Sequence, residues 1–436
     1  MRNYFTYLCA VFIRLTLILA ILILVEYYFY QALKNIFSEK FHRTLWILEL
    51  AWIICIIIIL LILIFYRPHQ WHDVFRIILS VILLIEISKL FGALFMLLDD
   101  IRRLFLVIFS FFNTSHKNIS SSNISRSEFF SQLAILFTFI PFAGFIYGIV
   151  RGAYKFKIHQ VELFFDELPS SFDGLKIVQI SDLHLGSFFN TKPVEKIVEL
   201  VNKEHADIIF FTGDLVNNIA DEAFPYKNIL SQLKAPMGVY SILGNHDYGD
   251  YVLWESESKK KENLWQLIQL QKEMGWDILL NENRILEKSG EKISIIGVEN
   301  WGGNLHFPKY GKLDIAYKGT ESIPFKILLS HDPSHWDLQV SKEFKDIQLT
   351  LSGHTHGFQF GVEYGNIKFS PVKWVYKHWA GLYKLKHKNL LAENKKDSLT
   401  KNVEQYLYVN RGVGFIGYPG RLGIWPEITV IKLRKG

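Results

Sequence analysis

Four long apolar stretches occupy the first third of the chain, and they limit its fold more than any other feature of the sequence. They run over residues 8–30, 44–66, 74–98 and 129–150, and Leu, Ile, Phe and Val dominate them. A helix needs ~20 residues to cross the hydrocarbon core of a bilayer, and each stretch approaches or exceeds that length. Within lipid a helix satisfies its own backbone polar groups. The sequence therefore predicts an integral membrane protein with an all-α bundle of about four transmembrane helices.

Three details of this region bear on its organisation. The first stretch could be a cleaved signal peptide, but its length and the three further stretches favour a membrane span. Residues 101–112 are apolar but too short to span alone, and they form either an interfacial segment or a continuation of the third helix. Glu86 and Lys89 stand three residues apart within the third stretch, so we expect them to pair on one helix face.

Charge and cysteine content exclude several classes of function. The net charge is +6, and no Lys/Arg run is dense enough to indicate a nucleic-acid partner. Both cysteines, Cys9 and Cys55, lie in the apolar region, which argues against a disulfide framework and excludes a thiolate metal site in the rest of the chain. Basic residues flank the apolar stretches on both sides, so the positive-inside rule indicates no orientation.

From about residue 158 the pattern changes to short β-like runs that alternate with amphipathic stretches, so we divide the chain into a membrane region, 1–153, and a second domain, 154–436. The predicted strands are 158–165, 175–181, 207–212, 238–243, 293–298, 325–330, 347–352, 406–410 and 428–433. The predicted helices are 191–204, 222–233 and 259–274. This order predicts a mixed α/β sandwich with its active site along the carboxyl ends of the strands.

Five of the predicted strands end in Asp, Asn or His. The segments are Ser181-Asp182-Leu183-His184, Gly213-Asp214, Gly244-Asn245-His246-Asp247, Ser330-His331 and Gly353-His354-Thr355-His356. The two-residue period of a strand would place Asp182 and His184 on the same side, where they could supply two metal ligands. A single such residue is common on a surface, and Asn245 alone could serve a turn. The repetition over five strand ends predicts a metal site.

In this order, the five segments resemble the calcineurin-like metallophosphoesterase family, and the resemblance covers residues 158–436. It implies a four-layer α/β/β/α sandwich for this domain, which the helical bundle, itself outside the resemblance, precedes. Membrane-anchored members of the family occur in bacteria, so the resemblance also implies an integral protein of the bacterial inner (cytoplasmic) membrane, with the side of the catalytic domain left open.

The resemblance further implies two divalent metal ions, held by Asp182, His184 and His356 on one side and by Asn245, His331 and His354 on the other, with Asp214 as the bridge. Mixed oxygen and nitrogen ligands suit Mn²⁺, then Fe, then Zn²⁺. The family assigns His246 to protonate the leaving oxygen or to stabilise the transition state. Asp247 would orient the imidazole of His246.

These residues predict hydrolysis of a phosphodiester, pyrophosphate or phosphomonoester bond by a metal-bridging hydroxide. The substrate would be a membrane lipid or lipid-linked nucleotide, as in the UDP-diacylglucosamine pyrophosphatases of the same superfamily, or a soluble phosphate ester. An inactive membrane scaffold or sensor is a third hypothesis, against which the complete ligand set argues.

Arg411 and Arg421, in glycine-rich segments, could contact phosphate or form salt bridges. The expected partners are the lipid bilayer and the phosphorylated substrate; the sequence indicates no oligomeric state.

Overall fold

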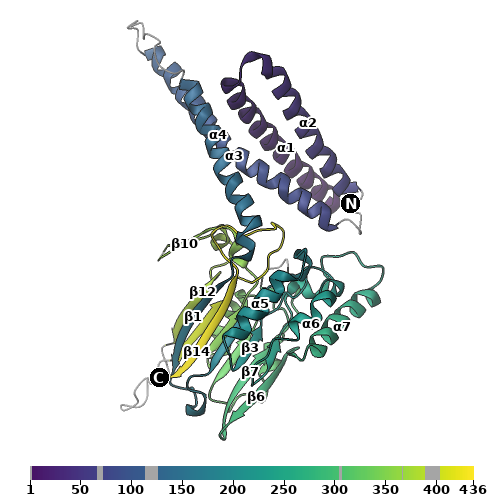
Figure 1. Cartoon of the computed structure of the whole chain (residues 1–436), viewed down its shortest axis with the longest axis vertical. Helices are drawn as coiled ribbons and strands as arrows, with labels where there is room; N and C mark the ends of the chain where they lie inside the picture. Colours follow the sequence, from purple (N-terminus) through teal and green to yellow (C-terminus); the bar gives the residue numbers. More distant parts are fainter. Residues whose placement is uncertain (1, 66–71, 113–125, 304–306, 366, 388–402) are drawn as a thin grey trace. The chain divides into compact units, whose positions relative to one another are not determined.

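The chain folds into two compact units, which we call the helical unit, Met1–Tyr147, and the α/β unit, Gly148–Gly436. The structure is a computed structural model, and its helices and strands are shown in Figure 1. It describes residues 2–65, 72–112, 126–303, 307–365, 367–387 and 403–436.

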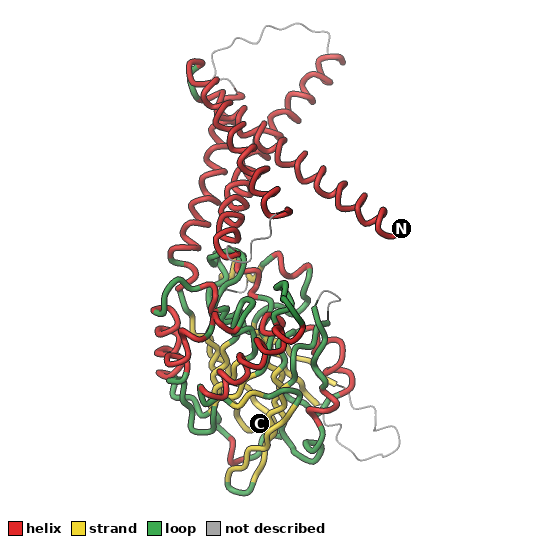
Figure 2. Tube along the Cα trace, turned by 90° about the vertical axis from the view of Figure 1, so that its right-hand side faces the viewer, coloured by secondary structure: helices red, strands yellow, loops and turns green. Residues whose placement is uncertain are grey.

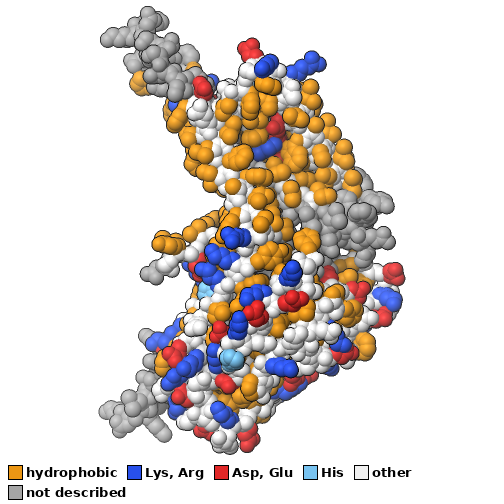
Figure 3. All heavy atoms as spheres, in the orientation of Figure 1, with side chains coloured by type: hydrophobic (Ala, Val, Ile, Leu, Met, Phe, Trp, Pro, Cys, Tyr) orange, Lys and Arg blue, Asp and Glu red, His pale blue; other side chains and the backbone are white. Residues whose placement is uncertain are grey.

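The helical unit is built from long apolar helices. They are α1 (Arg2–Ile36), α2 (Glu39–Phe65), α3 (His72–Phe112) and α4 (Arg126–Val150), the last of which ends in the α/β unit. Among the described residues, four helices are long and apolar enough to cross a membrane, which confirms the predicted bundle. Residues 101–112 continue α3 as regular helix. Apolar side chains cover the visible face of this unit, as a lipid environment requires (Figure 3).

A polar cluster lies between α1, α2 and α3. The ammonium of Lys89 lies 2.8 Å from a carboxylate oxygen of Glu26 and 3.1 Å from one of Glu49. Glu86 instead accepts a 2.7 Å hydrogen bond from the indole N–H of Trp52. The expected Glu86–Lys89 pair along one helix is therefore replaced by pairs between helices. The physical reason is that an ammonium buried in an apolar bundle gains more from two carboxylates than from one.

Two six-stranded sheets form the centre of the α/β unit. In the first sheet, β2, β3, β4 and β5 run parallel, β14 is antiparallel to β2, and β1 is parallel to β14. The strands of this sheet, in spatial order, are β1 (Lys157–Phe165), β14 (Glu427–Lys435), β2 (Lys176–Ile180), β3 (Ile208–Phe211), β4 (Val239–Ser241) and β5 (Asp277–Ile278).

The second sheet has a parallel centre with one antiparallel strand at each edge. In spatial order its strands are β12 (Gly381–His387), β13 (Val403–Val409), β9 (Leu349–Ser352), β8 (Lys326–Leu329), β7 (Glu291–Gly297) and β6 (Glu282–Lys288). A separate two-stranded hairpin consists of β10 (Val362–Tyr364) and β11 (Ile367–Phe369).

Alternating side chains on the strands build the layers. Ile208 and Phe210 of β3 belong to the core between the two sheets, whereas Ile209 and Phe211 belong to the core beneath the helices. Helices α5 (Lys192–Lys203), α6 (Lys227–Leu230) and α7 (Glu257–Glu273) contribute to that outer core of the first sheet. The outer core of the second sheet includes α8 (Leu313–Tyr317) and a π-helix over Trp336–Val340, which α9 (Ser341–Glu343) follows. The arrangement, visible in Figure 2, confirms the predicted α/β/β/α sandwich.

The structure confirms all nine predicted strands and two of the three predicted helices. The exception is 222–233, where the 3-10 turns Ala220–Glu222 and Phe224–Tyr226 precede the single turn of α6. Pro225 stands inside this segment, and its missing N–H and fixed ring favour short turns over a continuous helix.

Candidate metal centre

The candidate ligands stand directly after five parallel strands, β2, β3 and β4 of the first sheet and β8 and β9 of the second. Because the carboxyl ends of parallel strands meet at the same edge of a sheet, their loops converge. Five of these ligands have positive φ angles, namely Asp182 (54°), His184 (49°), Asp214 (60°), His354 (72°) and His356 (50°). Left-handed backbone costs a non-glycine residue roughly 1–2 kcal/mol, so its concentration here indicates a site whose geometry matters for function.

Glycines allow the ligand loops to approach one another. A Cβ atom on Gly244 would lie 2.2 Å from Oδ1 of Asp214, and one on Gly353 would lie 2.4 Å from Oδ2 of Asp182. Both distances are far shorter than any non-bonded contact allows. Gly244 and Gly353 are therefore required by the lack of space for a side chain and not by their backbone angles, because neither has a positive φ.

The first group of ligands consists of Asp182, His184, Asp214 and His356, whose donor atoms all lie within 4.8 Å of one another and are buried. Nε2 of His356 lies 3.2 Å from Oδ1 of Asp182, and Nε2 of His184 lies 3.0 Å from Nε2 of His356. Two nitrogen and two carboxylate donors at this spacing suit a divalent cation.

The second group consists of Asp214, His331 and His354, so Asp214 belongs to both groups. Nδ1 of His331 lies 2.7 Å from the carbonyl oxygen of Thr212, which directs Nε2 toward Asp214 at 3.1 Å. A backbone carbonyl that accepts one ring N–H fixes the tautomer in which the other nitrogen can bind metal.

Two buried atoms, one in the second group and one on the expected ligand Asn245, test whether a metal fits. Oδ1 of Asn245 and Nδ1 of His354 have no hydrogen-bond partner among the described residues. The opposite end of each side chain is occupied, by the hydroxyl of Tyr251 at 2.8 Å and by that of Tyr376 at 2.7 Å. A buried acceptor without a partner is costly, and a bound cation would remove this cost. The residues present therefore fit a metal.

Neighbouring histidines keep the carboxylate of Asp214 negatively charged, as the binding of a cation requires. Burial alone would raise the pKa of Asp214, but the rings of His331, His246 and His184 outweigh it and hold the pKa well below its usual range. Burial would lower the pKa of His331, yet Asp214 raises it to about 10. The negative charge of Asp214 is thus balanced by a proton on His331, and metal binding would displace that proton.

His246 stands beside both groups but is positioned differently from expectation. Its backbone N–H donates to Oδ1 of Asp214 at 2.9 Å, and its Nδ1 lies 2.7 Å from the carbonyl oxygen of Asn217. The imidazole is therefore oriented by a backbone carbonyl and not by Asp247. Burial lowers the pKa of His246.

The expectation that Asp247 orients the imidazole of His246 is therefore wrong. Its carboxylate accepts hydrogen bonds from the backbone N–H groups of Asp214 at 2.9 Å, Leu215 at 2.8 Å and Gly244 at 2.8 Å. Backbone donors surround the carboxylate because the two loops converge on it. Asp247 thus holds the loop that carries Asp214 against the loop that carries Asn245.

Neither arginine considered for phosphate binding lies on the surface. Arg411 is buried and pairs with Glu427 and, at 2.5 Å, with Glu363. Arg421 is fully buried, and its guanidinium donates to the carbonyl oxygens of Gly414 at 2.6 Å and Arg411 at 2.8 Å. Their positions indicate that both side chains organise the loops behind the ligands.

We expect Arg421→Met to lower the free energy of unfolding of the α/β unit by about 3 kcal/mol, because it leaves several buried carbonyl groups without a donor. The measurement is the urea midpoint of the detergent-solubilised full chain. Arg434→Met serves as the control, since this partly exposed arginine pairs with Asp173 on the surface and its loss should cost less than about 1 kcal/mol. An unchanged midpoint together with a raised KM would contradict this role and restore direct phosphate contact.

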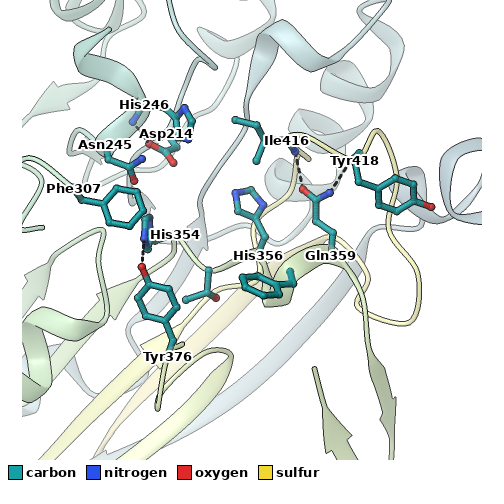
Figure 4. Close-up of a pocket in the computed structure, with 12 residues that line it drawn as sticks. Asp214, Asn245, His246, Phe307, His354, His356, Gln359, Tyr376, Ile416 and Tyr418 are labelled. Atoms are coloured by element: carbon teal, nitrogen blue, oxygen red, sulfur yellow. Dashed lines mark hydrogen bonds between the residues drawn. The ribbon is translucent and has the colours of Figure 1, made fainter. Parts of the chain in front are cut away.

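A cavity of about 330 Å³ opens over the ligands. Figure 4 shows Asp214, Asn245 and His246 on one side of it and Tyr376 reaching His354 from below. The remaining wall is largely aromatic and apolar, and it includes Phe307, Phe358, Tyr376, Ile416 and Tyr418. Sequence reasoning missed Tyr251 and Tyr376, because neither belongs to a strand-end segment.

Comparisons with known proteins agree with this geometry. Residues 10–153 match the family described as "Probable Calcineurin-like phosphoesterase, transmembrane domain", and residues 175–358 match "Calcineurin-like phosphoesterase". The chain is 28% identical to a "Transmembrane protein with metallophosphoesterase domain" from Danio rerio over 340 residues, which cover 76% of this chain and 70% of that protein.

Two relatives come from Bacillus subtilis (strain 168). The "Uncharacterized metallophosphoesterase YkuE" is 31% identical over 277 residues, covering 61% of this chain and 82% of the relative. The "Uncharacterized metallophosphoesterase YkoQ" is 30% identical over 305 residues, covering 68% of this chain and 96% of the relative. Together with the strand-end cluster of His and Asp residues, these matches show that the chain is a membrane protein of the calcineurin-like metallophosphoesterase family.

Proposed function

We propose that this protein is a membrane-anchored hydrolase that cleaves a phosphodiester, pyrophosphate or phosphomonoester bond with two divalent metal ions. The observation that carries the proposal is the sharing of Asp214 between the two ligand groups. A carboxylate has two oxygens and can neutralise two cations at once. Asp182, His184 and His356 would hold one ion, and Asn245, His331 and His354 the other.

When bound, such a metal pair supplies a water of lowered pKa and charge that stabilises the phosphoryl oxygens. Side chains of the cavity would supply proton transfer and would position the ligands. The Asn217 carbonyl accepts the Nδ1 hydrogen of His246, so Nε2 of the neutral ring carries no hydrogen. The protonated ring would pass its Nε2 proton to the leaving oxygen and would then regain a proton from water. Tyr251 and Tyr376 hold Asn245 and His354 in position through their hydroxyl groups.

The cavity wall supports a substrate with an apolar group next to its phosphate. Among the described residues that line the cavity, none is Lys or Arg, while Phe307, Phe358 and Ile416 contribute apolar surface. A highly charged soluble polyphosphate would find no basic side chain on this wall. We therefore propose a lipid or lipid-linked phosphate ester, reached from the bacterial cytoplasmic membrane in which the chain would be anchored.

The test uses the full chain, purified in detergent, stripped with a chelator and reloaded with Mn²⁺, Fe²⁺ or Zn²⁺, our order of preference. We expect about two ions per chain by elemental analysis and metal-dependent hydrolysis of bis-p-nitrophenyl phosphate. Fewer than one bound ion together with no turnover would favour the inactive scaffold or sensor. Incubation with a lipid extract should release phosphorylated headgroups; turnover of soluble esters alone would favour a tethered hydrolase of soluble substrates.

A further inference from the structure

The β10–β11 hairpin has its polar and apolar faces reversed relative to a hairpin that faces water. Its register pairs Glu363 with Lys368 on one face. Glu363 accepts a 2.5 Å hydrogen bond from Arg411, and the ammonium of Lys368 donates to the carbonyl oxygen of Ala380. The charged face is therefore turned toward the protein and anchored there.

The apolar residues occupy the opposite face. Tyr364 and Ile367 are register partners, with 82% and 65% of their surfaces exposed, and Val362 is 54% exposed. An exposed hairpin in water normally presents its polar residues outward and packs its apolar residues inward. Both strands of the hairpin turn their apolar residues to the exposed face, so the reversal is a property of the whole hairpin and not of a single side chain.

The apolar surface continues into the next turn of the chain. Trp374 is 73% exposed, and its ring packs edge-on against Phe369 with 5.9 Å between centroids. The ammonium of Lys373 lies 4.5 Å from the centroid of the Phe369 ring, and Lys377 is largely exposed nearby in the chain. Aromatic and aliphatic side chains bordered by lysines match the boundary between lipid tails and anionic headgroups.

The last residues of α4 and the root of the hairpin contact the same loop of the α/β unit. The fourth span includes Gly148, whose carbonyl oxygen accepts a 3.1 Å hydrogen bond from the backbone N–H of Arg421 within the α/β unit. The next residue, Leu422, pairs with the base of the hairpin: its carbonyl oxygen accepts from Gly361 at 2.9 Å. One loop therefore contacts both the end of the span and the root of β10.

From these observations we infer that the β10–β11 hairpin and the adjoining Trp374 and Val375 insert into the headgroup region of the bilayer that holds the helical unit. The occupant of this surface is lipid. We call the exposed side chains of Val362, Tyr364, Ile367, Trp374 and Val375 the insertion surface.

The insertion surface is connected to the cavity by short stretches of chain. Trp374 precedes Tyr376 by two residues, and the hydroxyl of Tyr376 lies 2.7 Å from Nε2 of His354. Phe358 lines the cavity four residues before β10 begins. A hairpin seated in lipid would thus place the apolar side of the cavity next to the membrane surface.

The test measures lipid contact directly in the full chain, with Cys9→Ser and Cys55→Ser to leave one label site. Tyr364→Cys is labelled with an environment-sensitive nitrobenzoxadiazole dye and reconstituted into nanodiscs of phosphatidylcholine and phosphatidylglycerol. Phe164→Cys is the matched control, because Phe164 is 56% exposed and lies near the far end of β1. Seven residues of strand separate it from Lys157, the residue at which β1 begins after the fourth span, which corresponds to roughly 23 Å.

We expect lipids that carry a shallow doxyl quencher to reduce the fluorescence at position 364 at least twofold, with little change at 164. Aqueous iodide should show the opposite preference.

Equal iodide access at both positions, without lipid quenching at 364, would overturn the inference. Protection from iodide without lipid quenching would also overturn it, because protein such as a second copy would then cover the surface. Ile367→Cys repeats the test if the first variant does not fold. The readout needs no turnover, so it stands apart from the proposed activity.

Discussion

Replacing Asp214 by Asn should remove metal from both halves of the candidate centre and lower turnover by about 10⁴-fold or more. Asp214 is the one residue shared by the two ligand groups, and its carboxylate lies 3.1 Å from Nε2 of His331 and 3.6 Å from Nε2 of His184. An amide keeps the shape but loses the negative charge that balances two cations. The measurements are elemental analysis of the purified chain and hydrolysis of bis-p-nitrophenyl phosphate after reloading with metal.

Asp173→Asn is the control for this experiment, because that exposed carboxylate pairs with Arg434 on the surface away from the ligand groups. It should retain metal and rate. If Asp214→Asn lost activity while binding as much metal as the wild-type chain, the bridging role would be wrong, and Asp214 would serve the loop geometry or the chemistry in another way.

His246→Ala should keep both metals and lose about 10²- to 10⁴-fold in kcat. The side chain belongs to neither ligand group, whereas its ring lines the cavity beside them. If Nε2 passes a proton to the leaving oxygen, the loss should grow as the leaving group becomes more basic. A series of aryl and alkyl phosphate esters measures this dependence.

The matched variant is His387→Ala, which removes a histidine bonded to Gln405 outside the candidate centre and should leave kcat unchanged. An equal loss for every leaving group would point to transition-state charge stabilisation instead of proton transfer. Loss of metal from His246→Ala would show that the imidazole ring itself supports the ligands, because alanine keeps the backbone N–H that donates to Asp214.

The candidate ligands could be found from sequence because they obey a simple rule. Each follows a buried apolar strand, and the carboxyl ends of parallel strands converge whatever the intervening loops contain. Asp182 and His184 are two residues apart at one such end, and the structure brings them within reach of Asp214 and His356 from other strands. The convergence of the strand ends carries this information without any knowledge of long-range contacts. The two-residue strand period expected for Asp182 and His184 does not apply, because both lie beyond the end of β2 in left-handed backbone.

The roles of neighbouring residues could not be found in the same way. Asp247 and His246 are adjacent in sequence, which suggested a direct contact, but the side chain of Asp247 turns toward backbone N–H groups of a different loop. Arg411 and Arg421 stand in glycine-rich segments that resemble exposed loops. Their surroundings include groups distant in sequence, namely the carboxylate of Glu363 beside Arg411 and the carbonyl oxygen of His356 beside Arg421.

The hairpin illustrates a further limit. Residues 362–364 and 367–369 alternate between apolar and charged types, which is typical of strands, yet the runs are too short to stand out. Alternation predicts that the two faces differ but not which of them faces the protein. That choice is made by Arg411 and the Ala380 carbonyl, which bind the charged face.

The ion cluster between the helices has a consequence for how the protein is made. Glu26 and Glu49 arrive in the first two helices, and the ammonium that pairs with both, Lys89, is synthesised only with the third. A lone charge at the centre of a membrane helix costs roughly 2.5–3.5 kcal/mol on insertion scales. We therefore expect the first two helices to reach their stable positions only once the third has entered the bilayer, so that the three helices assemble together.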